Sequence, residues 1–236
     1  MDTGMKLNDL FHHPQVINLA HRSDRRRQVN AQLKRAGVQA GFFLAQRMTE
    51  AGDWPSAGAR GCFDSHFRIL EQALSANEPN VLLIEDDLEF APDFRAVEEL
   101  VMAQIAEADW DICYLGHLFA DESTPPHALE RTDEPVMTTY FYAVNGRILP
   151  RLVEFLRQVR ERPAGHPLGG PQHVDGALTM FRQQNPDVCT LLVKPRLGIQ
   201  SASRSDVNAA WYDQLPLAGA LINFARRCRR KLSLAA

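Results

Sequence analysis

Three consecutive carboxylates follow an apolar stretch in the segment VLLIEDDLEF, residues 81–90. An apolar run without alternation predicts a strand buried on both faces of a parallel sheet, and ligands bind beyond the carboxyl ends of such strands. Glu85 and Asp87 would share one face of the strand, and Asp86 would point the other way. A hard divalent cation, Mn²⁺ or Mg²⁺, would relieve the repulsion between these charges. The alternative is a solvated acidic turn in front of a helix.

Arginines gather where the segment VINLAHRSDRRRQ passes from a predicted strand into a predicted helix. The positive charges of Arg22 and Arg25 oppose the helix dipole, which favours anions at this end. The arrangement makes sense if a phosphate binds there to main-chain N–H groups and guanidinium groups. Asn18, at the end of the strand, could hydrogen-bond a base or a ribose. The alternative is a solvated basic face of the helix.

A second face is expected on the helix predicted at 61–76, beside its apolar stripe. This face carries Cys62, Ser65 and His66. A serine or cysteine nucleophile is not indicated, because there is no GxSxG turn and adjacent residues on a helix point about 100° apart. We expect His66 to pack in the core or to orient a substrate.

The elements that would position these residues alternate between strands and helices, which indicates an α/β fold in a single domain. Ser23 is a predicted N-cap, Gly37 is a predicted helix end, and Pro150 is expected to interrupt its helix. Loops rich in glycine, proline or polar residues are predicted at 48–60, 117–135 and 162–172. Strands are predicted at 15–20, 41–46, 81–85, 111–116, 136–144 and 189–195, and helices at 23–36, 61–76, from Pro92 onward, at 145–160 and at 174–184.

The composition restricts the class of protein. The chain has 236 residues and a hydrophobic fraction of 45%, enough for a sizeable core, and its net charge of −3 gives no basic excess for nucleic acid. The four cysteines form no CxxC pair, which predicts reduced thiols in a cytosolic protein. The N-terminal residues resemble neither a signal peptide nor an anchor, and no stretch approaches the roughly 18 apolar residues of a spanning helix. We therefore expect a cytoplasmic globular protein.

Several segments in order resemble the motifs of glycosyltransferase family 25. They are VINLAHRSDRR, GARGCFDSHFRIL, VLLIEDDLEF and YLG, followed by YFYAVNGRIL, HVDGAL and IQSASRSDV, and together they cover roughly residues 14–207. This family includes bacterial lipopolysaccharide and lipooligosaccharide galactosyl- and glucosyltransferases and collagen galactosyltransferases. The resemblance implies a GT-A-like fold, in which a mixed, mainly parallel sheet is flanked by helices. It also implies a UDP-galactose or UDP-glucose donor and inversion at the anomeric carbon.

The resemblance also implies roles for individual residues. The acidic segment corresponds to the metal-binding DxD motif of such folds, so Asp87 would be the main ligand of Mn²⁺ or Mg²⁺, with Glu85 and Asp86 in support. The residues expected to bind the donor are Asn18, Leu19, Arg22, Arg25, Ser65, His66, Glu85 and Asp86.

Acceptor-side candidates lie in the second half of the chain. Asp175 follows the glycine-rich loop 165–170 and is the candidate general base, with a plain helix N-cap as the alternative. His173 could be a third metal ligand or an acceptor contact, although a surface histidine is the more ordinary interpretation. Lys194 and Arg196 could hold phosphate. The residues expected to bind substrate hydroxyls are Gln200, Ser201, Ser205 and Asp206.

A basic amphipathic helix is predicted at 216–232, so we divide the chain into a transferase domain at 1–214 and a C-terminal helix at 215–236. Such a helix could lie on the anionic inner face of a membrane, next to a lipid-linked glycan acceptor, or it could dock on the core. Two rival functions remain open at this point. One is a metal-dependent phosphohydrolase, and the other is a non-catalytic protein that binds a nucleotide sugar.

Overall fold

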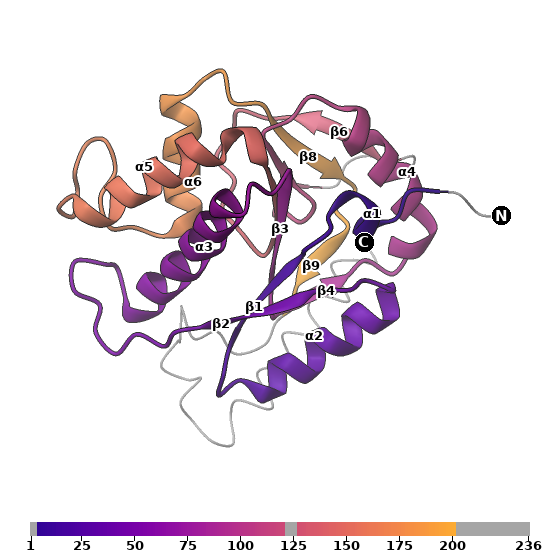
Figure 1. Cartoon of the computed structure of the whole chain (residues 1–236), viewed down its shortest axis with the longest axis horizontal. Helices are drawn as coiled ribbons and strands as arrows, with labels where there is room; N and C mark the ends of the chain where they lie inside the picture. Colours follow the sequence, from indigo (N-terminus) through magenta and orange to yellow (C-terminus); the bar gives the residue numbers. More distant parts are fainter. Residues whose placement is uncertain (1–3, 121–126, 202–236) are drawn as a thin grey trace.

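The computed structural model describes residues 4–120 and 127–201, whose centre is a seven-stranded sheet with the order β2-β1-β3-β7-β5-β8-β6 (Figure 1). Five strands run in one direction, while β7 and β6 run against their neighbours. The predicted mixed and mainly parallel sheet is therefore confirmed. The strands are β1 (Gln15–Leu19), β2 (Gly41–Ala45), β3 (Asn80–Glu85), β5 (Ile112–Tyr114), β6 (Ala128–Arg131), β7 (Phe141–Asn145) and β8 (Thr190–Lys194).

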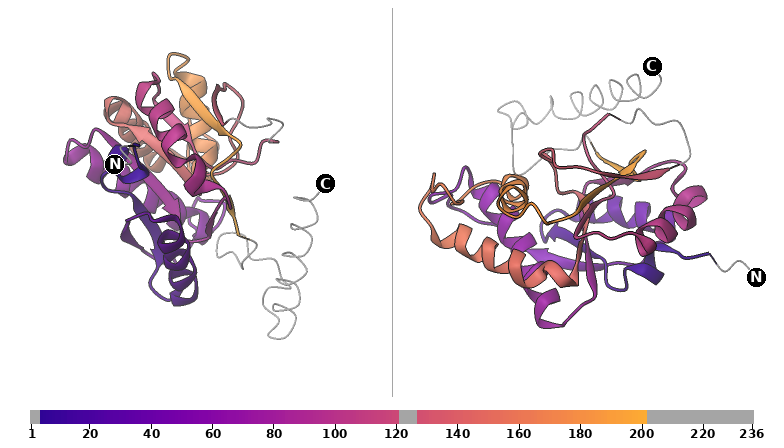
Figure 2. Two further views of the ribbon diagram at one scale, coloured as in Figure 1. Left: turned by 90° about the vertical axis from the view of Figure 1, so that its right-hand side faces the viewer. Right: turned by 90° about the horizontal axis from the view of Figure 1, so that it is seen from above.

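Helices cover both faces of this sheet (Figure 2). One face packs against α3 (Ala57–Ser75), α5 (Leu149–Glu161) and α6 (Val174–Gln184), and the other packs against α1 (Leu7–Leu10), α2 (Ser23–Ala36) and α4 (Phe94–Glu107). The strand β3 serves both cores, because Leu83 faces the first group of helices and Leu82 and Ile84 face the second. This explains why its sequence is apolar without alternation.

Several predicted boundaries were wrong, and each has a local cause. The helix α3 begins at Ala57, not at residue 61, because the hydroxyl of Ser56 accepts a hydrogen bond from the N–H of Ala59 and caps it earlier. Pro150 does not interrupt α5 but stands in its first turn, where its missing N–H costs nothing. The helix α4 begins at Phe94, two residues after the proline expected to open it.

The helix α2 spans the predicted residues, but its N-terminal cap differs. Arg22, not Ser23, occupies the N-cap position, and it makes no side-chain capping bond. At the other end Gly37 adopts φ 75°, the left-handed conformation that glycine adopts without strain, so this prediction is confirmed.

The prediction from sequence missed several short strands. The strand β6 lies inside the connection predicted as loop at 117–135, and the strand predicted at 136–144 begins only at Phe141. A separate two-stranded sheet pairs β4 (Leu88–Phe90) with β9 (Gly198–Gln200), with Leu88 opposite Gln200. Three-residue strands carry too little periodicity to be recognised, yet this pairing brings the late segment beside the acidic segment.

The structure describes neither Ser205 and Asp206 nor the helix predicted at 216–232, so these predictions lie outside the described residues. The three cysteines that it does describe, Cys62, Cys113 and Cys189, form no disulfide with one another. None of the described helices combines the length and the apolar character needed to cross a bilayer.

Candidate active site

A cleft of about 630 Å³ opens at the carboxyl ends of three adjacent parallel strands. Leu19, Ala45 and Glu85, the last residues of β1, β2 and β3, all line it. The N-terminal parts of α3 and α6 line it as well, through residues 57–59, 61–62 and 174–175. Parallel sheets commonly bind ligands at this edge, where loops and helix N-termini meet. The acidic segment is therefore placed where a ligand would bind.

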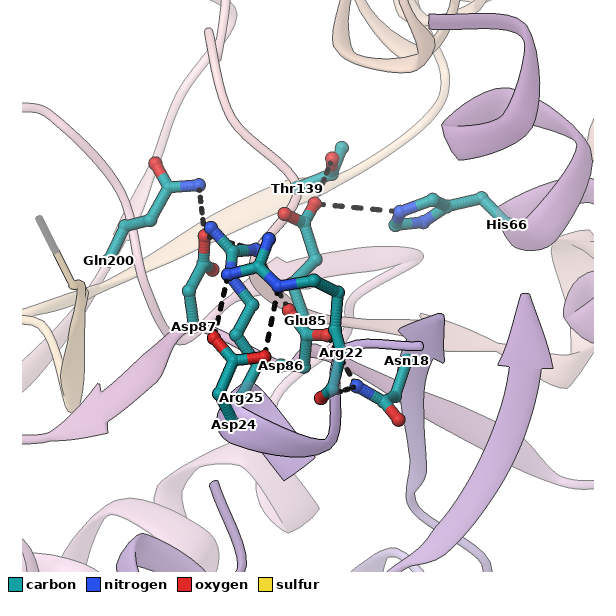
Figure 3. Close-up of polar contacts among 10 residues, drawn as sticks. All are labelled: Asn18, Arg22, Asp24, Arg25, His66, Glu85, Asp86, Asp87, Thr139 and Gln200. Carbon is teal, nitrogen blue, oxygen red and sulfur yellow. Dashed lines mark hydrogen bonds and ion pairs between the residues drawn. The ribbon is translucent and has the colours of Figure 1, made fainter. Parts of the chain in front are cut away.

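Asp86 is held firmly from two sides (Figure 3). Its Oδ2 accepts a hydrogen bond of 2.6 Å from the side-chain amide of Asn18, and its Oδ1 lies 2.9 Å from Nη1 of Arg25. All three residues are less than one-tenth exposed. Burial raises the pKa of Asp86, and the positive charge of Arg25 opposes that rise. Both oxygens of Asp86 are thus occupied by groups of the chain itself.

The carboxylate oxygens of Asp87 have fewer hydrogen-bond partners. Its Oδ2 lies 3.4 Å from Nη1 of Arg25 and accepts a hydrogen bond of 3.2 Å from the side-chain amide of Gln200. Its buried Oδ1 has no hydrogen-bond partner among the described residues. Burial, followed by the neighbouring charge of Glu85, raises the pKa of Asp87 to about 7. A carboxylate oxygen left free in a closed site would accept a cation or a ligand donor.

Glu85 faces a buried histidine and a threonine (Figure 3). Thr139 donates a hydrogen bond of 3.0 Å to its Oε1, and Nε2 of His66 lies 3.5 Å from the same atom. The other ring nitrogen of His66 is 3.0 Å from the hydroxyl of Tyr142. Burial alone would raise the pKa of Glu85, but His66 and Thr139 together lower it below its ordinary value. These surroundings therefore favour the ionised form of Glu85 and the protonated form of Asp87.

Comparison with known proteins shows which family this chain resembles. Residues 11–123 match the family described as Glycosyltransferase family 25 (LPS biosynthesis protein). The resemblance to glycosyltransferase family 25 is confirmed. A procollagen galactosyltransferase 1-B of Xenopus laevis is 28% identical over 205 residues, or 77% of this chain. A glycosyltransferase 25 family member of Drosophila melanogaster is 28% identical over 213 residues, or 80% of the chain.

The chain spans only about a third of the length of these two relatives, 32% and 34% respectively. Among solved structures, a glycosyltransferase involved in glycosylation of the major capsid of PBCV-1 superimposes with a TM-score of 0.53 at 9% identity. The match covers 92% of this chain and 98% of that one. At this identity the likeness concerns the fold alone, and it agrees with the predicted GT-A-like architecture. The family 25 match covers Asn18, Arg25, His66 and the acidic segment, whereas Asp175 and Gln200 lie beyond it.

Most of the predicted site residues come together at the cleft, although their roles are not tested by this geometry. Asn18 and Arg22 do not line it, since Asn18 is buried against Asp86 and the Arg22 guanidinium pairs with Asp24 at 3.0 Å. Ser201 lies behind it and donates its main-chain N–H to the carbonyl oxygen of Asp87. Those that line the cleft are Leu19, Arg25, Ser65, His66, Glu85, Asp86, Asp87, His173, Asp175 and Gln200.

Lys194 and Arg196, suggested as phosphate ligands, do not line the cleft. The ammonium group of Lys194 pairs with Glu130 at 2.9 Å, and Arg196 donates to the main-chain oxygen of His117. Ser65 lines the cleft, but its hydroxyl donates to the carbonyl oxygen of Gly61 within its own helix.

Sequence reasoning missed three residues that shape the site. Thr139 and Tyr142 hold Glu85 and His66 from β7 and the segment before it. Nothing in the sequence marks them, because their partners lie 54 and 76 positions away. Arg47 could have been found, since it is a basic residue directly after a predicted strand. It is exposed and lines the cleft, so it adds positive charge there.

Proposed function

We propose that this chain is a hexosyltransferase that moves galactose or glucose from a UDP-sugar to a hydroxyl of a glycan acceptor, with inversion at the anomeric carbon. The observation that carries this proposal is the cleft at the ends of β1, β2 and β3. It combines the acidic segment Glu85–Asp87 with Arg25 and Asp175. The family 25 match and the GT-A-like fold support the same reaction class.

The oxygen donors of the acidic segment fit a hard divalent cation. Asp87 presents a buried Oδ1 without a hydrogen-bond partner among the described residues, and a bound cation would favour the ionised form of this carboxyl. Asp86 is already held by Asn18 and Arg25, so its contribution would be to support the site. Bound by Asp87 and Glu85, Mn²⁺ or Mg²⁺ would supply positive charge against the diphosphate leaving group.

The chain itself offers further stabilisation for a diphosphate. Arg25 and Arg47 both line the cleft, and guanidinium groups bind phosphate oxygens through paired N–H donors. The N-terminal turns of α3 also face the cleft, where a helix dipole favours anions. Negative charge grows on the diphosphate as its bond to the sugar breaks. Donors fixed at that position lower the barrier, since they need no reorganisation during the reaction.

Transfer also requires that the acceptor hydroxyl lose its proton as its oxygen forms the new bond to the anomeric carbon. Asp175 is the proposed base, because it lies half-buried in the first turn of α6 on the wall of the cleft. Its Oδ1 accepts a hydrogen bond of 2.8 Å from the N–H of Gly176, which would hold the carboxylate in place. His173, two residues before it, is exposed and also lines the cleft.

The family description, LPS biosynthesis protein, favours a lipopolysaccharide or lipooligosaccharide acceptor, and procollagen galactosyltransferase names a protein-bound alternative. For a lipid-linked glycan we propose a cytoplasmic protein that associates with the inner face of the membrane. That association would involve the predicted helix at 216–232, which lies outside the described residues.

A thermal-shift panel of nucleotide sugars, with and without Mn²⁺, tests the proposal first. We expect metal-dependent stabilisation by a UDP-sugar that is lost in Asp87→Asn and kept in Asp133→Asn, a change at an exposed aspartate. The stabilising donor is then incubated with glycan acceptors and the products are analysed. Phosphate release without any acceptor would indicate the phosphohydrolase instead. Donor binding without turnover on any acceptor would indicate a binding protein.

A further inference from the structure

We propose that Cys62, His66 and Glu85 form a second metal site, suited to a borderline-soft divalent cation such as Zn²⁺. One ligand atom from each residue lies within 4.8 Å of the other two. The trio shares Glu85 with the proposed Mn²⁺ or Mg²⁺ site at Asp87, but it differs in chemistry because it adds a sulfur and an imidazole nitrogen to that carboxylate. It is an inference about the chain's own residues and does not depend on the proposed transferase activity.

The geometry of the trio follows from two elements of the fold. Cys62 and His66 are one helical turn apart on α3, so both side chains point from the same face of that helix. Glu85 reaches them from the end of β3, and its Oε1 already lies 3.5 Å from Nε2 of His66. Zinc bonds of about 2.0–2.3 Å place tetrahedral ligand atoms roughly 3.3–3.8 Å apart. The three ligand atoms lie within 4.8 Å of one another, so they would have to move closer together to bind the metal.

The state of His66 is the second observation that points to a bound cation. Its side chain is fully buried, and its Nε2 forms no hydrogen bond among the described residues, although it lies 3.5 Å from Oε1 of Glu85. A metal ion bound between this nitrogen and the Glu85 carboxylate would give both atoms a closer contact than they make with each other. The opposite ring nitrogen faces the hydroxyl of Tyr142 at 3.0 Å. Zinc-bound histidines are commonly held in this way, with one nitrogen on the metal and the other on an orienting partner.

The carboxylate is oriented in the same manner, because Thr139 donates a hydrogen bond of 3.0 Å to Oε1 of Glu85. All three proposed ligands line the cleft, so the fourth position of a tetrahedral site would be open to water or to an oxygen-bearing ligand. On binding, the thiol of Cys62 releases its proton to solvent and the thiolate bonds to the metal. Sulfur and imidazole ligands favour Zn²⁺ over Mg²⁺ and Mn²⁺.

Cobalt(II) alone is a direct probe of this site, because a cobalt–thiolate bond gives a near-ultraviolet charge-transfer band that oxygen ligands do not give. We expect the full-length chain, kept reduced, to bind one Co²⁺ with this band, and Zn²⁺ to abolish the band by displacement. In Cys62→Ser the band should vanish and the Zn²⁺ affinity should fall more than about tenfold. Cys189→Ser, which alters a half-buried thiol elsewhere, should retain both.

Two further variants keep the test decisive. Tyr142→Phe leaves the ligands in place but removes the partner of His66, so Zn²⁺ affinity should fall about 10–100-fold. Asp87→Asn should leave the cobalt–thiolate band unchanged while it removes stabilisation by Mn²⁺. Circular dichroism confirms that each variant is folded. A wild-type chain without the band, a band that persists in Cys62→Ser, or a band lost in Asp87→Asn would each overturn the proposal.

Discussion

The guanidinium of Arg25 lies 2.9 Å from the carboxylate of Asp86, although the two residues are 61 positions apart in the chain. Both side chains are 9% exposed, so the pair is nearly removed from water. It joins the start of α2 to the end of β3, the two elements that frame one side of the cleft. A buried ion pair need not be more stable than an apolar pair of the same shape, but removing one partner leaves an uncompensated charge.

The Arg25→Met substitution should therefore destabilise the fold strongly. It leaves Asp86 and Asp87 buried without their shared cation, and we expect the free energy of unfolding to fall by about 3–5 kcal/mol. Urea denaturation followed by circular dichroism measures this change. The matched control is Arg27→Met on the exposed side of the same helix, expected within about 0.5 kcal/mol of wild type. Equal stability of the two variants would contradict the role of Arg25.

Asp87 should make stability depend on pH in an unusual direction. Burial and Glu85 raise its pKa from 3.8 to about 7, so between these values the folded chain holds a proton that the unfolded chain has lost. The free energy of unfolding must then fall as pH rises through this window, by about 1.4 kcal/mol for each unit that the pKa is raised. Asp87→Asn removes this contribution. We expect the variant to gain stability over wild type at about pH 8 and much less at about pH 4.

Urea denaturation in EDTA at a series of pH values tests this expectation. Chelation matters, because a cation bound to Asp87 would stabilise the ionised form and reverse the trend. Asp133→Asn, at an exposed position, is the control and should follow the wild-type curve at every pH. A gain in the Asp87 variant that does not change with pH would show that its carboxyl titrates at an ordinary pKa.

Part of this site could be predicted from sequence because it is encoded locally. The apolar run before Glu85 indicated a strand buried on both faces, and the acids directly after it therefore lie at the edge of a parallel sheet. Gly37 ends α2 in the left-handed conformation that the residue type suggested. Local sequence patterns of this kind predicted most strands and helices and the edge of the sheet at which the cleft lies.

The remaining features depend on contacts between distant segments. Gln200 reaches Asp87 across 113 positions, because the three-residue strands β4 and β9 pair, and neither strand shows enough periodicity to be recognised. The contact of His66 with Tyr142 spans 76 positions, and no local pattern distinguishes that tyrosine from other core aromatics. Phosphate binding by Arg25 was predicted from its position at a helix start. Its contacts of 2.9 Å with Asp86 and 3.4 Å with Asp87 could not be predicted in the same way, because those residues are distant in the chain.

The Asp175→Asn substitution tests the proposed base. Asparagine keeps the size of the side chain and the hydrogen bond from the N–H of Gly176, but it cannot accept the acceptor's proton. We expect kcat for sugar transfer to fall about 10²–10⁴-fold, the usual contribution of general base catalysis. Because Asp175 is not one of the proposed metal or donor ligands, thermal stabilisation by the donor with Mn²⁺ should stay unchanged. Transfer kinetics and thermal shifts on the same preparation measure both quantities.

The matched control is Asp187→Asn, which alters an exposed acid beyond the other end of α6 and should leave kcat within about twofold of wild type. If Asp175→Asn transfers sugar at the wild-type rate, another group takes the proton. Other groups that line the cleft and could accept a proton include His173 and Glu85.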